Sequence, residues 1–112
     1  MHQNYKNKVL KANDIATMST GKRLGHPVRS IKNPYTKEYF KLEYSNISDE
    51  ELEAYGRGSL YRAAVEGDEK TGCFLAGQIA GMVNKEQTAK EIIEEIFTQA
   101  EDVLKGATKW VK

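Results

Sequence analysis

Residues 71–83 read Thr-Gly-Cys-Phe-Leu-Ala-Gly-Gln-Ile-Ala-Gly-Met-Val, a small, apolar run without charge in which Gln78 is the lone large polar side chain. Gly72, Gly77 and Gly81 lack a Cβ, so the backbone there can take a positive φ or lie close to another surface. Gly77 and Gly81 would share one face of a helix. The spacing favours a buried core helix tightened by glycines. The alternative is a backbone surface offered to a flat ligand. The run is too short to span a bilayer.

The composition is that of one small globular domain or a piece of a larger protein. Of 112 residues, 39% are hydrophobic and 29% are charged, which excludes a disordered or low-complexity chain. The single cysteine, Cys73, excludes an internal disulfide and a zinc cluster of cysteines, and we interpret it as a small buried hydrophobe. Together with an N-terminus unlike a signal peptide, it predicts a cytoplasmic location, with no membrane partner.

Charge is distributed unevenly along the chain. Residues 1–41 hold nine Lys and Arg against two acidic residues, and the remainder has a net charge of −6, for an overall charge of +1. This split suits an anionic partner or attraction between the halves. The basic residues of the loop region are Lys22, Arg23, His26, Arg29 and Lys32. Without interleaved aromatics they favour solvated surface charge over a nucleic-acid site, so we expect no nucleic-acid partner.

Four elements are predicted in the first half of the chain. Residues 3–12 form an amphipathic helix with Tyr5 and Val9 on one stripe and no residue to cap its start. Residues 13–33 are extended, with one strand around 28–31. A helix with an aromatic face begins at Pro34, because proline suits the first helical position. Residues 48–51 form a capping box for a helix that ends near residue 55.

The next helix is predicted from Ser59, as its cap, to a stop at Gly67, with Leu60, Ala63 and Ala64 on its buried face. The preceding Gly-Arg-Gly-Ser lacks the lysine and the spacing of a P-loop, which excludes that interpretation.

The last helix has the most regular pattern in the sequence, with its cap predicted at Asn84 and Gln87. Its apolar residues follow helical spacing without interruption: Ala89, Ile92, Ile93, Ile96, Phe97, Ala100, Val103, Leu104 and Ala107. A stripe of this length needs a large partner. Either the shorter helices fold over it as a small bundle, or it packs on something absent from this chain.

Four blocks, in one order, resemble the C-terminal third of the nitronate monooxygenase family, and the resemblance extends over essentially the whole chain. They are residues 5–12 (YKNKVLKA), 25–33 (GHPVRSIKN), 76–81 (AGQIAG) and 84–92 (NKEQTAKEI). The branch they resemble most is the FMN-dependent enoyl-acyl carrier protein reductase II. The resemblance implies a fragment of a TIM (β/α)8-barrel flavoprotein whose barrel strands, FMN phosphate loops and catalytic histidine are absent from this chain.

The implied fold class is mainly α with one extended segment. Residues 1–83 would be a helical excursion covering the barrel mouth, and residues 84–112 the C-terminal helix of the barrel wall. Because the chain opens at Met1 without a preceding turn or strand, its first helix is expected to follow an upstream element.

The resemblance also implies the site residues. Ala76, Gly77 and Gln78 match a turn that lies close to the flavin, where the Gln78 amide can hydrogen-bond the ring or a substrate. Arg29 and Lys32 match basic positions that contact an anionic cofactor or carrier protein. Neither histidine matches the catalytic position, so no catalytic residue and no metal ligand is assigned.

The predicted function is that of a C-terminal fragment, inactive alone, of an enoyl-acyl carrier protein reductase II that uses FMN and NAD(P)H. A nitronate monooxygenase parent and a free-standing helical interaction module are the alternatives. A basic nucleic-acid adaptor is a weaker third. The expected partners are the missing barrel, an acyl carrier protein substrate and a second copy of the chain.

Overall fold

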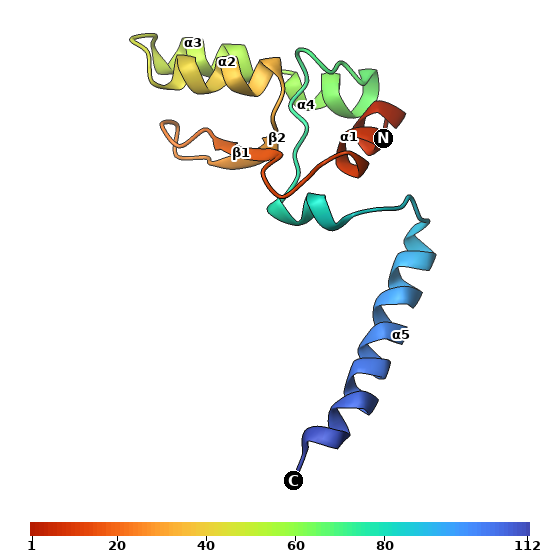
Figure 1. Ribbon diagram of the computed structural model, residues 1–112. Helices are drawn as coiled ribbons and strands as arrows, with labels where there is room; N and C mark the ends of the chain where they lie inside the picture. Colours follow the sequence, from red (N-terminus) through yellow and green to blue (C-terminus); the bar gives the residue numbers. More distant parts are fainter.

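The computed structural model describes all residues, 1–112, and consists mostly of helices around a two-stranded sheet (Figure 1). The elements are α1 (Gln3–Leu10), β1 (Thr17–Thr20), β2 (Val28–Ile31), α2 (Pro34–Glu43), α3 (Asp49–Gly56), α4 (Ser59–Tyr61), the π-helix η1 (Arg62–Glu66), the 3-10 helix η2 (Gln78–Met82), α5 (Ala89–Ala107) and the 3-10 turn η3 (Thr108–Trp110).

The sheet pairs the predicted strand with one that the sequence did not indicate. β1 and β2 are antiparallel, with Thr17 opposite Ile31 and Thr20 opposite Val28. The strand at residues 28–31 is thus confirmed. β1 was missed because its four residues, Thr-Met-Ser-Thr, show no clear alternation of apolar and polar side chains. The chain therefore has two strands where one extended segment was expected.

The apolar run at residues 71–83 is not a core helix, so the prediction that its spacing favoured is wrong. Its first part is extended and lies along the free edge of β2, where the Ile31 N–H donates to the Phe74 carbonyl at 2.8 Å and the Ala76 N–H to the Arg29 carbonyl at 3.2 Å. An isolated bridge joins Ser30 and Leu75. These bonds to β2 satisfy backbone groups that a helix would satisfy internally. Only η2 is helical.

Two predicted helix starts are confirmed. The Asn33 side chain accepts the Thr36 N–H at 2.9 Å, and Pro34 is the first residue of α2. At α3 the Ser48 hydroxyl accepts the Glu51 N–H at 3.1 Å, and the Glu51 carboxylate accepts the Ser48 N–H at 2.9 Å.

Three other starts differ from the prediction. α1 does have a cap, since His2 Nδ1 accepts the Asn4 N–H at 3.1 Å. The residue before α4 is Gly58, at φ 74°, and Ser59 is already helical. α5 is capped by Thr88 with Glu91, four residues after the predicted Asn84 cap, because Thr88 and Glu91 complete a capping box directly before the helix.

The core consists of two small clusters joined by the extended part of residues 71–77. Tyr35, Tyr39, Leu52 and Cys73 form the first cluster. Ile31, Ala63 and Phe74 form the second, with Tyr5 and Val9 of α1 packed against it. Burial raises the pKa of the Cys73 thiol. This fits the prediction that Cys73 is a buried hydrophobe.

The predicted buried face of residues 60–64 is only partly correct. Ala63 is fully buried, but Leu60 is 53% exposed. The helix becomes a π-helix at Arg62, and its wider turn shifts the side chains away from the spacing of a regular α-helix. Gly67 ends it at φ 66°, as predicted.

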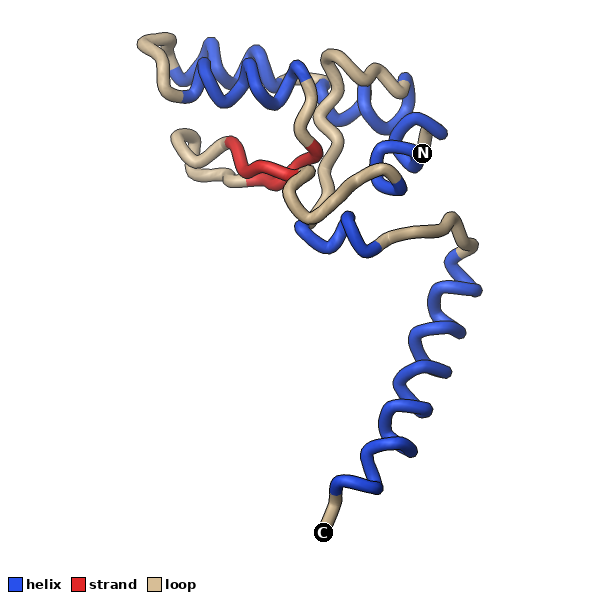
Figure 2. Tube along the Cα trace, viewed as in Figure 1, coloured by secondary structure: helices blue, strands red, loops and turns tan.

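α5 leaves the rest of the molecule and contacts no other helix along most of its length (Figures 1 and 2). None of its residues is buried, and the molecule is accordingly long, 61 × 33 × 19 Å. The expectation of a small bundle is therefore wrong. The exposed apolar residues of the helix are Ile92, Ile93, Ile96, Phe97, Val103 and Leu104. None of the helices combines the length and apolar character needed to cross a membrane.

A substitution at Gly72 tests the close packing around the extended segment. A Cβ there would lie 2.6 Å from the Asp68 carbonyl oxygen and 2.8 Å from the Ala63 backbone. We expect Gly72→Ala to lower the free energy of unfolding by roughly 1–3 kcal/mol through overpacking. Gly77→Ala is the matched control, because no atom lies closer than 4.0 Å to its Cβ position. Urea unfolding measures both variants, and equal stabilities would contradict this packing.

Candidate functional site

The candidate site is the edge formed by Ala76, Gly77 and Gln78, where the extended segment turns into η2. The chain is anchored just before this edge on two sides. The Ala76 N–H donates to the Arg29 carbonyl of β2, and the Tyr5 hydroxyl of α1 donates to the Leu75 carbonyl at 2.6 Å. The edge is therefore fixed by a strand and a helix.

The exposed surface of this edge suits a flat ligand with polar groups on its rim. Gly77 and Gln78 are exposed, and a Cβ at Gly77 would approach nothing more closely than Ile79 Cγ2, at 4.0 Å. The backbone at Gly77 is thus uncovered. The side-chain amide of Gln78 forms no hydrogen bond within the chain, so both its donor and its acceptor are available.

The other end of η2 is held by close backbone packing. A Cβ at Gly81 would lie 2.7 Å from the Asn13 backbone, and Ala80 is buried. Gly72 and Gly81 therefore serve close approach within the chain, whereas Gly77 leaves its face open. The sequence suggested either close packing or an open backbone surface for these glycines, and the structure shows the first at Gly72 and Gly81 and the second at Gly77.

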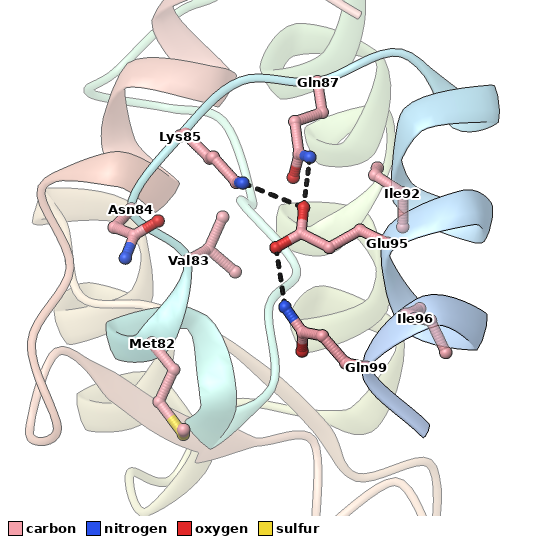
Figure 3. Close-up of a pocket in the computed structure, with 9 residues that line it drawn as sticks. All are labelled: Met82, Val83, Asn84, Lys85, Gln87, Ile92, Glu95, Ile96 and Gln99. Carbon is pink, nitrogen blue, oxygen red and sulfur yellow. Dashed lines mark hydrogen bonds and ion pairs between the residues drawn. The ribbon is translucent and has the colours of Figure 1, made fainter. Parts of the chain in front are cut away.

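A second feature lies where η2 leads into α5, a hollow of about 350 Å³ that Figure 3 shows in close-up. Val83 lies across from Ile92 and Ile96 of α5, and Met82 also lines the hollow. The Glu95 carboxylate accepts hydrogen bonds from Lys85 at 2.8 Å, from Gln87, and from Gln99 at 3.0 Å. The Lys85 ammonium and then the Gln87 amide lower the pKa of Glu95 below its usual value.

Polar contacts also tie this junction to α1. The Glu86 carboxylate pairs with the Lys6 ammonium and accepts the Gln3 amide at 3.2 Å. Lys6 and then Gln3 lower the pKa of Glu86. The start of α5 is thus oriented by Glu86 and Glu95, while its apolar face remains open.

The two predicted anion contacts lie apart. The Arg29 guanidinium donates to Thr17 Oγ1 at 3.1 Å, and its carbonyl adjoins Ala76. Lys32 lies beyond the other end of β2, where its ammonium donates to the Ile15 carbonyl at 2.7 Å. The Arg29 backbone therefore adjoins the edge, whereas its guanidinium is bonded to β1 and the Lys32 ammonium to the Ile15 carbonyl.

The histidines and acidic groups form no metal site. His2 is engaged as the cap of α1, and His26 is exposed in the β1–β2 loop. No group of three His, Cys, Asp or Glu side chains is placed to hold a metal ion.

Sequence reasoning missed Glu43, the last residue of α2. It is buried and accepts backbone N–H groups from Gly21 at 3.2 Å and Arg23 at 2.8 Å. A signal was present, because Glu43 follows Tyr35 and Tyr39 at four-residue intervals and so lies on the buried aromatic face.

A scan against protein-family models gives no match, and no curated protein matches the chain. Among solved structures, FabK from Thermotoga maritima matches 98% of this chain with a TM-score of 0.91 and 34% identity. A single-residue variant of the same FabK matches with a TM-score of 0.79 and 31% identity.

FabK is an enoyl-acyl carrier protein reductase II, and this chain covers 35% of its length. The comparison does not extend to nitronate monooxygenases. Over nearly all of its residues, this chain is thus similar in sequence and in structure to about one third of an enoyl-acyl carrier protein reductase II.

Proposed function

We propose that this chain forms the lid and the last barrel helix of an FMN-dependent enoyl-acyl carrier protein reductase II. The observation that carries the proposal is the match to FabK, which includes α5 although that helix has no cover within the chain. The remaining two thirds of such a reductase would supply the cover.

α5 has the properties of a barrel-wall helix. Its Ile93, Ile96 and Phe97 side chains are 57–68% exposed on one side. Covering each such side chain contributes roughly 1.5–3 kcal/mol. In a (β/α)8 barrel, the outer helices pack on the strands with just such a face. The contacts of Glu86 and Glu95 orient the start of α5 before the helix packs on the barrel.

The edge of Ala76, Gly77 and Gln78 would then face the flavin at the barrel mouth. The uncovered backbone at Gly77 allows the ring to approach closely, and the Gln78 amide is free to bond the ring or the substrate. When bound, FMN supplies the hydride-transfer chemistry that links NAD(P)H to the enoyl thioester. Arg29, whose backbone adjoins Ala76, and Lys32, which follows β2, would contact the anionic part of a nicotinamide cofactor or an acyl carrier protein.

A chimera tests this proposal. The matching third of Thermotoga FabK is replaced by this chain, and the purified protein is assayed for bound FMN and for NADH oxidation with a crotonyl thioester. We expect stoichiometric flavin and thioester-dependent turnover. Flavin with turnover only on an alkyl nitronate would favour the nitronate monooxygenase alternative. A folded chimera without flavin would contradict the proposal and favour the helical interaction module.

Gln78 provides a sharper test within that chimera. Gln78→Leu removes the free amide, and the loss of one hydrogen bond of about 1–1.5 kcal/mol predicts a roughly tenfold weaker flavin or thioester interaction. Flavin fluorescence titration and kcat/KM measure it. Asn46→Leu, an exposed amide without hydrogen bonds in the α2–α3 turn, is the control. Unchanged affinity and turnover in Gln78→Leu would mean that the edge is ordinary surface.

A further inference from the structure

We propose that Glu43 is a positioning residue that fixes the β1–β2 loop, residues 21–27, as a rigid wall beside the flavin-facing edge. This inference rests on the proposed function for the identity of the edge. It concerns a residue outside that edge, whose side chain would touch neither cofactor nor substrate.

Glu43 is in an unfavourable place for a carboxylate. It is the only buried charged side chain, at 3% exposure, and it forms no ion pair. It also ends α2, where the negative end of the helix dipole opposes a negative charge. A buried charge without an ion partner destabilises the fold unless hydrogen bonds satisfy it. Here those bonds come entirely from the β1–β2 loop.

Each carboxylate oxygen of Glu43 holds one backbone group of the loop. Oε2 accepts the Gly21 N–H and Oε1 accepts the Arg23 N–H. The Arg23 side chain adds a second attachment nearby, since it donates to Asp49 at 2.8 Å and to the Ile47 carbonyl at 2.6 Å. In Figure 1 the loop lies beneath the C-terminal end of α2, as these bonds require.

The loop is closed on itself, so fixing its start also fixes its end. Gly21 has φ 82°, and its carbonyl accepts the His26 N–H at 3.1 Å. The Gly25 N–H donates to the Lys22 carbonyl, also at 3.1 Å. A Cβ on Gly21 would lie 2.6 Å from the His26 carbonyl oxygen, which leaves no room for a side chain. Glu43 therefore determines where His26 lies.

His26 and Gly21 form one side of a hollow of about 200 Å³. Leu60, Leu75 and Tyr39 also line it. Leu75 is directly followed by the edge proposed to face the flavin. The position of the loop thus affects the shape of this hollow, which adjoins the edge proposed to face the flavin. If a substrate group binds in this hollow, displacement of the loop would weaken substrate binding and leave the rate of hydride transfer unchanged.

The test compares Glu43→Gln with Glu38→Gln in the FabK chimera. Glu38 lies on the same helix, is exposed, and pairs only with Lys41. A glutamine at 43 has a single acceptor oxygen, so one of the two loop N–H groups loses its partner. We expect amide hydrogen exchange in residues 21–26 to rise at least tenfold, and the KM for the thioester to rise several-fold. Flavin content and kcat should stay within twofold of the unchanged chimera.

Gly21→Ala keeps the test decisive if Glu43→Gln fails to fold. It displaces the loop while the carboxylate stays intact, so it should reproduce the same rise in KM and in exchange. Unchanged loop exchange in either folded variant would overturn the proposal, as would a loss of flavin and kcat at constant KM. If the chimera binds no flavin, the proposed function fails, and loop exchange in the 112-residue chain still decides the role of Glu43.

Discussion

The structure depends on the pairing of residues 73–76 with the outer edge of β2. The bonds from Ile31 to Phe74 and from Ala76 to Arg29 hold this segment extended between the two core clusters. Cys73 enters one cluster and Phe74 the other. The same pairing brings Ala76, Gly77 and Gln78 to the surface. The pairing with β2 therefore determines both the packing of the core and the position of the candidate site.

The chain holds itself together with few apolar contacts and many polar ones. Only eight hydrophobic residues are buried, a small core for 112 residues. Polar groups supply much of the order instead, with Asn33 bonded to the Gly72 carbonyl at 2.7 Å and Glu43 to the β1–β2 loop. Such a division suits a piece that completes its apolar packing against a larger body.

Local signals in the sequence predicted most elements. The capping box at Ser48, the proline at position 34 and the uninterrupted stripe of the last helix each located a helix, because each acts within a few residues. The same reasoning failed for residues 71–83, which were predicted to form a core helix. Their glycine spacing suits a helix, but the bonds to β2 come from forty residues away, and no local pattern reveals them. The burial of Glu43 depends on a loop twenty residues earlier, so its bonding partners were equally hidden.

The candidate site shows the same limit. The resemblance to a flavoprotein family indicated Gln78 and Gly77, and the structure exposes both. The resemblance could not show that the Arg29 backbone adjoins Ala76 while Lys32 lies away from Ala76. That difference arises from the register of β2 with the extended segment.

The central claim is that α5 belongs against a barrel that this chain does not contain. Amide hydrogen exchange measures this directly, in the chain alone and in the FabK chimera. Alone, α5 should exchange rapidly while Leu52 and Phe74 in the core remain protected, because none of the α5 residues is buried. In the chimera, α5 should gain protection comparable to the core. Equal protection of α5 in both proteins would contradict the account.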